Sequence, residues 1–211
     1  MRFRQEAARE LEAGAFPCGL MAAMDGVCVR LALAEKARHP WQKRLYFLQA
    51  ARAYAEGVEE LGRAWEDRPP QARGLLGYAA HLQAYRASAG FRRLREEGEA
   101  AWEALKGIRY VLHVHEGRLV LRAFQGEPDY GERVVETFRA FFGSSPPRFA
   151  EPGGMSPPWL NHIEEWILDH LALLFPQAFA LLEAFHREHQ GFVEEAVARL
   201  EREARFFLAY L

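Results

Sequence analysis

Apolar residues along most of this chain recur every three or four positions, which is the spacing of one face of an α-helix. The pattern predicts helices over residues 2–13, 18–37, 41–65, 74–85, 91–105, 130–142, 159–175, 177–189 and 192–211. Proline and glycine lie between several of these segments, as at Pro40, the pair Pro69-Pro70 and Gly191. We therefore expect a mainly α fold, a bundle of long helices.

The stretch from Gly107 to Gln125 breaks this pattern, because apolar and polar residues alternate there with the period of two that is typical of a β-strand. Residues 108–114 place apolar side chains at even positions, and the alternation resumes over 119–124. The sequence His115-Glu116-Gly117-Arg118 between the two runs supplies a glycine where a tight turn needs positive φ. The stretch predicts one β-hairpin, which must rest on helices because two strands alone are marginally stable.

The hairpin divides the chain into three parts. Residues 1–106 form a first helical part, residues 107–129 an inserted hairpin subdomain, and residues 130–211 a second helical part. Residues 143–158 are rich in Ser, Pro and Gly, which indicates an exposed connection within the last part.

Composition and charge restrict the class of protein. The 211 residues carry 27 basic and 29 acidic side chains, a net charge of −2, so any contact with nucleic acid must be local rather than driven by total charge. Cys18 and Cys28 are the only cysteines, and they can form a disulfide only if the helix breaks near Asp25-Gly26. No charged-then-apolar leader and no run of about 18 apolar residues is found. These features favour a reduced, cytoplasmic protein that does not cross a membrane.

The hairpin carries most of the candidate DNA-contacting residues. His113 and His115 share one strand face with Arg109, and the return strand adds Arg118 and Arg122. Such a face can lie along a DNA backbone and contact phosphates without reading bases. The neighbouring acidic residues Glu116, Glu127 and Asp129 oppose this hypothesis, and a solvated sheet face is the alternative.

A second basic cluster contains Arg92, Arg93 and Arg95, of which Arg92 and Arg93 are further candidates for DNA contact. Glu96, Glu97 and Glu99 follow at once, and i to i+4 ion pairs on an exposed helix are the alternative there.

Histidines and carboxylates in the second helical part raise the alternative of a metal site. One predicted helix carries His162, Glu165, Asp169 and His170, and the next carries His186 and His189. Because Trp166 lies among the first set, structural or surface roles are favoured and we assign no metal ligand. No Ser/His/Asp or Cys/His arrangement is recognisable, so we assign no catalytic residue and do not expect an enzyme.

Several short strings in the chain resemble MutS-like proteins, in particular the short bacterial MutS-related P-loop ATPases. The resemblance follows the order of Arg44-Leu45-Tyr46-Phe47-Leu48, Tyr85-Arg86-Ala87-Ser88-Ala89-Gly90-Phe91, Ile108-Arg109-Tyr110, Gly126-Glu127-Pro128-Asp129-Tyr130, Asn161-His162-Ile163-Glu164 and Phe206-Phe207-Leu208-Ala209-Tyr210-Leu211. It implies a core and a lever of long helices, a small clamp at the position of the hairpin, and a role in DNA repair or recombination in which the protein binds or embraces DNA.

The chain also departs from that family. It contains no GxxxxGK[ST] string, so it has no P-loop and no cofactor of its own, and ATP with Mg²⁺ is implied only for a C-terminal ATPase part that this chain lacks. The apolar end of the predicted helix 192–211 is expected to continue into such a part or to bind a partner. Phe192-Val193-Glu194 fits the mismatch-reading string of the family but lies far from the N-terminus, so mismatch recognition is not supported.

Alternative functions stay open at this point. The chain could be a stand-alone helical scaffold that binds a protein partner, or a second copy of itself as a homodimer, without touching DNA. A metal-binding helical protein is a third hypothesis.

Overall fold

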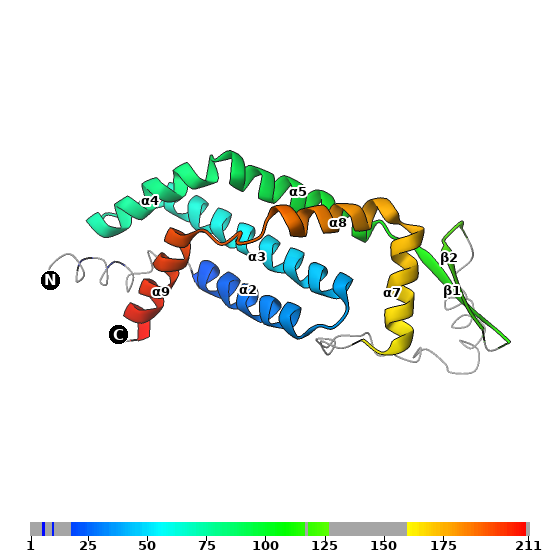
Figure 1. The fold of residues 1–211 in the computed structure, drawn as a ribbon. Helices are drawn as coiled ribbons and strands as arrows, with labels where there is room; N and C mark the ends of the chain where they lie inside the picture. The colour runs from blue at the N-terminus through cyan, green and yellow to red at the C-terminus, as the bar shows by residue number, and fades with distance from the viewer. Residues whose placement is uncertain (1–5, 7–9, 11–17, 117, 127–159, 210–211) are drawn as a thin grey trace, which may run out of the picture.

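A computed structural model describes residues 6, 10, 18–116, 118–126 and 160–209 (Figure 1). These residues form seven helices and one antiparallel hairpin, which confirms the prediction of a mainly α fold with a small β element. The elements are α2 (Cys18–Lys36), α3 (Pro40–Asp67), α4 (Arg73–Arg86), α5 (Ala89–Lys106), β1 (Tyr110–His115), β2 (Arg118–Ala123), α7 (His162–Leu174), α8 (Pro176–Glu188) and α9 (Glu195–Ala209). The predicted helix 130–142, the segment 143–158 and most of the predicted helix 2–13 lie outside the described residues.

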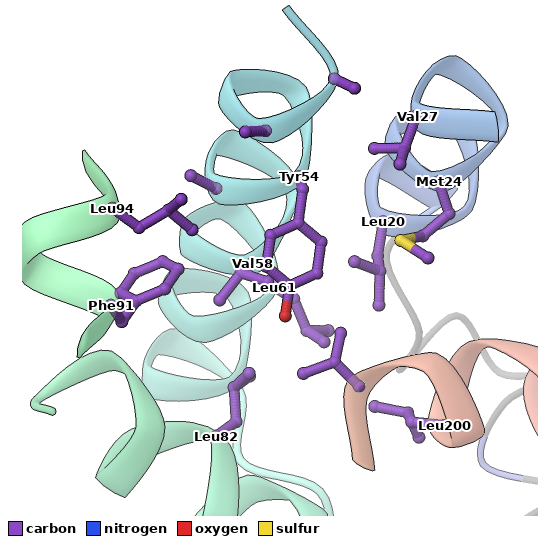
Figure 2. Packing of buried hydrophobic residues seen from close by; sticks show 14 of the residues in the cluster. Leu20, Met24, Val27, Tyr54, Val58, Leu61, Leu82, Phe91, Leu94 and Leu200 are labelled. Carbon is purple, nitrogen blue, oxygen red and sulfur yellow. The ribbon is translucent and has the colours of Figure 1, made fainter. Parts of the chain in front are cut away.

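Helix α3 is the centre of the bundle. Its 28 residues place apolar side chains on several faces, so Tyr54, Val58 and Leu61 are fully buried between α2 on one side and α5 on the other (Figure 2). The same cluster takes in Leu182 of α8 and Leu200 of α9. One continuous core therefore joins helices from both helical parts of the chain.

A second, smaller core lies at the end of the bundle that carries the hairpin. Leu171 of α7 and Phe179 of α8 are buried there, and Trp41 packs edge-on against Phe179 with ring centroids 5.0 Å apart. Ile108 and Leu121 of the hairpin segment pack against the same cluster. The hairpin thus rests on helices, as its two-stranded size requires.

The helix ends follow local capping chemistry. Asn161 caps α7, because its side-chain oxygen accepts from the N–H groups of Ile163 and Glu164 while the Glu164 carboxylate accepts from the Asn161 N–H. Ser88 caps α5 in the same manner by accepting from the Phe91 N–H. Pro176 is the first residue of α8, where its missing N–H costs nothing.

The last predicted helix begins later than expected. The sequence predicted a helix from Phe192, but α9 begins at Glu195. The Glu194 carboxylate accepts from the Val197 N–H and so caps α9, while the Phe192 ring packs 5.3 Å from the ring of Phe47 and stays outside the helix. Gly191 has φ +72, a left-handed conformation that glycine adopts without strain, and it separates α8 from α9.

Helix α2 is continuous across Asp25-Gly26, where the sequence left open a break. Cys18 and Cys28 lie on this one helix, ten residues or about 15 Å of helix rise apart. The helix therefore holds the two cysteines too far apart for a disulfide, and Cys28 is a free, exposed thiol.

Candidate nucleic-acid interface

The register of the hairpin sorts its side chains onto two faces. Val111 pairs with Arg122, His113 with Val120, and His115 with Arg118, and side chains directly opposite each other in an antiparallel pair point to the same side. Among the described side chains, one face thus collects His113, Arg118 and Arg122 together with Val111 and Val120. In β2, Leu119, Leu121 and Ala123 on the other face are half-buried, and Arg118, Val120 and Arg122 are exposed. In β1 the order is reversed, because Tyr110 and Leu112 are exposed while Val111 and His113 are half-buried. The solvent-facing arginines of the polar face therefore come from β2.

Two side chains of the polar face bind each other. The Arg122 guanidinium donates from Nη2 to His113 Nε2 at 2.9 Å, which requires His113 Nε2 to be unprotonated. This bond holds the Arg122 side chain over the exposed face of the hairpin. The side chain of His115 lies outside the described part of the structure.

The remaining arginines of the hairpin are open to solvent. Arg109 and Arg118 are exposed and make no side-chain hydrogen bond or ion pair with any described residue. Arg109 precedes β1, and its carbonyl accepts from the Phe124 N–H at 3.1 Å, which extends the ladder by one pair. The polar face therefore presents Arg109, Arg118 and Arg122 along neighbouring strands.

The turn of the hairpin differs in detail from the prediction. Two residues connect His115 to Arg118, and the first of them, Glu116, has φ +50. Two-residue turns of this kind need positive φ at their central residues because that backbone twist matches the twist of the strands. The predicted turn position is confirmed. Glu116 has the positive φ that the sequence analysis expected only of Gly117, which lies outside the described residues.

Arg92 and Arg93 do not join the hairpin. They lie at the start of α5, about 21 Å of helix rise from Lys106 at its end. Arg93 donates to Glu97 at 2.9 Å, an i to i+4 pair that raises the pKa of Arg93 through the hydrogen bond and then through the charge. The sequence thus correctly identified this pair, which supports the surface-helix alternative for Arg93.

The predicted i to i+4 pair of Arg95 with Glu99 is replaced by pairs between helices. Arg95 donates to Glu59 of α3 at 2.8 Å, and Glu99 accepts from Arg52 of α3 at 3.0 Å. Arg92 lines a shallow groove between α3 and α5, in which the positive and negative charges are equal in number. The charged lining residues are four arginines and four glutamates: Arg52, Arg63, Arg92, Arg95, Glu56, Glu59, Glu96 and Glu99. A groove of this composition has no net attraction for a polyanion.

The candidate metal ligands go to separate partners. Asp169 accepts from His39 Nε2 at 3.1 Å, His189 pairs with Glu97 at 2.8 Å, and the ring of His170 bonds the Trp166 carbonyl. The His186 ring packs edge-on against Phe47. Within the ranges that the structure describes, no group of three or more His, Cys, Asp or Glu side chains is placed to hold a metal ion.

The hairpin end of the molecule carries a further set of cations that sequence periodicity did not single out. Lys36, Arg38 and Lys43 flank the connection between α2 and α3 and are exposed. The signal was present as the run Lys-Ala-Arg-His-Pro-Trp-Gln-Lys-Arg from residue 36 to residue 44, which has no acidic residue. Its relevance depends on its position in space, next to α7, which periodicity alone does not reveal.

Among known proteins, no family model, no curated protein and no solved structure matches this chain. No single helix of the described residues is long and apolar enough to cross a membrane, although α7 and α8, which meet at an angle of 102°, pass that test of length and composition as a bent pair.

Proposed function

We propose that this chain is the DNA-binding core, lever and clamp portion of a MutS-like protein. In this proposal the hairpin is the clamp tip, which contacts DNA phosphates through Arg109, Arg118 and Arg122. The observation that carries it is the set of exposed arginines on the hairpin, Arg109, Arg118 and Arg122, at one end of the bundle, while the start of α2 and the described end of α9 lie toward the other (Figure 1). The resemblance of the sequence strings to MutS-like proteins supports the same assignment.

The bundle offers a rigid body for such a role. Helix α3 extends for about 42 Å and is buried on several faces, so a displacement at one end is transmitted to the other. Helix α9 is linked to it at Glu194, whose N–H donates to the buried Tyr54 hydroxyl at 3.0 Å. In the proposal α9 couples the state of an ATPase part to the lever. The sequence has no P-loop, so no residue of this chain is assigned to hold ATP or Mg²⁺, and the chain itself is non-catalytic.

The test is a salt-titrated binding series against duplex, mismatched, branched and single-stranded DNA. We expect binding whose logarithm falls linearly with the logarithm of salt concentration, by about 0.9 for each phosphate contacted on duplex DNA. Arg109→Glu, Arg118→Glu and Arg122→Glu together should abolish most of the binding. The matched control is Arg68→Glu, Arg73→Glu and Arg202→Glu, which reverses three exposed arginines far from the hairpin. Equal binding by both triple variants would rule out the clamp assignment.

One observation favours the alternative of a protein-interaction scaffold. Leu173 at the end of α7 is 76% exposed and Phe206 of α9 is 58% exposed, values that are high for large apolar side chains. A scaffold of this kind would associate with itself or with a partner through these residues. Light scattering of the chain and of Phe206→Ser and Leu173→Ser variants distinguishes the two functions, since only the scaffold requires an association that these substitutions remove.

A further inference from the structure

The connection between α2 and α3 is the most basic exposed stretch at the hairpin end. We call residues 36–43 the basic turn, with Lys36, Arg38 and Lys43 as its cations. All three are exposed, and none of their side chains forms a hydrogen bond or ion pair with a residue that the structure describes. Arg44, the next residue, differs because it donates to Glu183 at 2.8 Å and stacks over Trp41. The three cations of the basic turn are therefore available to an external anion.

The basic turn is held at a fixed position. His39 is buried, and its Nε2 lies 3.1 Å from Oδ1 of Asp169 on α7. Trp41, the second residue of α3, belongs to the same small core as Ile108 and Leu121 of the hairpin segment. The basic turn and the hairpin consequently lie on either side of α7 at one end of the bundle (Figure 1).

The end of α3 adds to the positive potential. Helix α3 begins at Pro40 inside the basic turn, and no side chain caps its N-terminus. The N-terminal end of a helix carries a partial positive charge and free N–H groups, which favour an anion. The basic turn thus combines three cations with the positive end of a 28-residue helix.

The acidic side chains nearby only partly oppose this potential. Helix α7 carries Glu164, Glu165 and Asp169, but the Glu164 carboxylate binds the Asn161 N–H and the Asp169 carboxylate binds His39. Glu35, in the last turn of α2, is the acidic residue next to the basic turn in the sequence. Within residues 35–43 the three cations accompany one carboxylate, that of Glu35, so the turn itself is cationic.

We propose that the basic turn is a second phosphate-contacting element, so that one DNA duplex is held by the turn and the hairpin together. This inference rests on the proposed function of the hairpin. A helix with its side chains is about 10–12 Å across, so the two elements that flank α7 can reach the backbone of one duplex at separate points. Phosphate contacts of this kind position a duplex and contribute affinity without sequence preference.

The experiment compares three variants, each with three positive charges removed. The turn variant carries Lys36→Gln, Arg38→Gln and Lys43→Gln, and the hairpin variant carries Arg109→Gln, Arg118→Gln and Arg122→Gln. The control carries Arg68→Gln, Arg73→Gln and Arg202→Gln, exposed arginines away from both elements. Binding to a fluorescent duplex of about 30 base pairs is measured by anisotropy at several salt concentrations, after circular dichroism has shown equal helix content.

We expect both the turn variant and the hairpin variant to bind at least about tenfold more weakly than the control at low salt. Each should also show a shallower dependence of binding on salt. The slope should decrease by about 1 for every phosphate that the variant no longer touches, hence by about 2 to 3 for three substituted cations.

Weaker binding of the hairpin variant alone would overturn the inference and leave the proposed function standing. Weaker binding of the turn variant alone would support the turn as a phosphate contact and refute the clamp assignment. No binding by the unaltered chain would refute both. The same proteins are also mixed with vesicles that contain an anionic phospholipid. If the turn variant binds these vesicles more weakly than the control but binds the duplex equally well, the turn is a membrane contact and the inference is overturned.

Discussion

The packing of α2 against α3 depends on Gly57, and a single methyl group tests it. A Cβ atom added at Gly57 would lie 2.5 Å from the Cβ of Ala23 on α2. Carbon atoms are in favourable contact at about 3.5–4.0 Å, so the two helices would have to separate by about 1 Å. Both Cβ atoms are fixed to helix backbone, and neither can rotate away. Gly57→Ala should therefore disturb the largest helix pair of the core.

The expected magnitude is a difference between two effects. Replacing a glycine inside a helix by alanine stabilises the helix by about 1 kcal/mol, whereas overpacking a tight core costs about 1–3 kcal/mol. We expect Gly57→Ala to lower the free energy of unfolding by up to about 2 kcal/mol. Gly77→Ala in α4 is the matched control, because a Cβ there would meet nothing within 4 Å. That control should be more stable than the unaltered chain by about 0.5–1 kcal/mol.

Urea unfolding followed by far-ultraviolet circular dichroism measures both variants. The double variant Gly57→Ala with Ala23→Gly moves the methyl group from α2 to α3 and removes the collision. It should be more stable than the sum of the single effects by about 1–3 kcal/mol, a coupling that only direct contact produces. If Gly57→Ala is as stable as Gly77→Ala, or if the coupling is zero, the close approach of the two helices at this point is wrong.

Three further predictions concern buried or half-buried polar groups. Tyr54→Phe removes the acceptor of the Glu194 N–H and the donor to the Tyr85 hydroxyl at 3.3 Å, and should lower the free energy of unfolding by about 1–3 kcal/mol in urea titrations. Burial and the hydrogen bond with Tyr85 raise the pKa of Tyr54 far above its ordinary 10.0. Above pH 10 the unfolded chain therefore releases a proton that the folded chain keeps. The contribution of this group to stability should be constant below pH 10 and should fall above it by about 1.4 kcal/mol per pH unit. Burial is the main cause that lowers the pKa of His186 below its ordinary 6.5, and the charge of Arg44 is the second cause. As the pH falls below about 6.5, the unfolded chain takes up a proton first, so the free energy of unfolding should decrease.

Controls for these predictions come from the same residue types. Tyr46→Phe should leave the free energy of unfolding unchanged, since the Tyr46 hydroxyl has no hydrogen-bond partner among the described residues. The Tyr54→Phe variant should lose its share of the decline above pH 10. His186→Gln should lose the decline below pH 6.5, while His162→Gln, at an exposed position, should keep it. A pH profile of stability identical in all four proteins would contradict the assignments.

The periodicity of the sequence predicted the described helices well, and local chemistry bounds several of them. Helix α3 extends from Pro40 to Asp67, and both ends coincide with proline signals in the sequence. The position of the hairpin and its turn also followed from alternation and from the turn sequence at residues 115–118. The start of α9 was missed because the packing of Phe192 against Phe47 is a contact between distant segments, which overrides a helical pattern.

The partners of charged residues could not be predicted from spacing. Glu59 illustrates the reason: it accepts from Arg86 of α4 and from Arg95 of α5, residues 27 and 36 positions away. Spacing predicted Arg93 with Glu97 correctly, because both lie on one helix, but it also predicted partners for Arg95 that α3 supplies instead. The basic turn was missed for the same reason, since its relation to the hairpin exists only through α7.

The proposed function places a geometric requirement on the bundle, which the dimensions of α3 meet. Glu194, at the start of α9, binds Tyr54, which lies 14 residues or about 21 Å along α3 from Pro40. The basic turn and the hairpin share the small core around Trp41, so they move together with that end of α3. A rigid-body rotation of about 15° about Tyr54, of the size documented in allosteric proteins, would move that end by about 5 Å. Successive phosphates of one DNA strand rise by about 3.4 Å along the helix axis, so such a movement exceeds one step of that rise. Under the proposed function, a change in α9 would therefore make or break contacts with the DNA backbone.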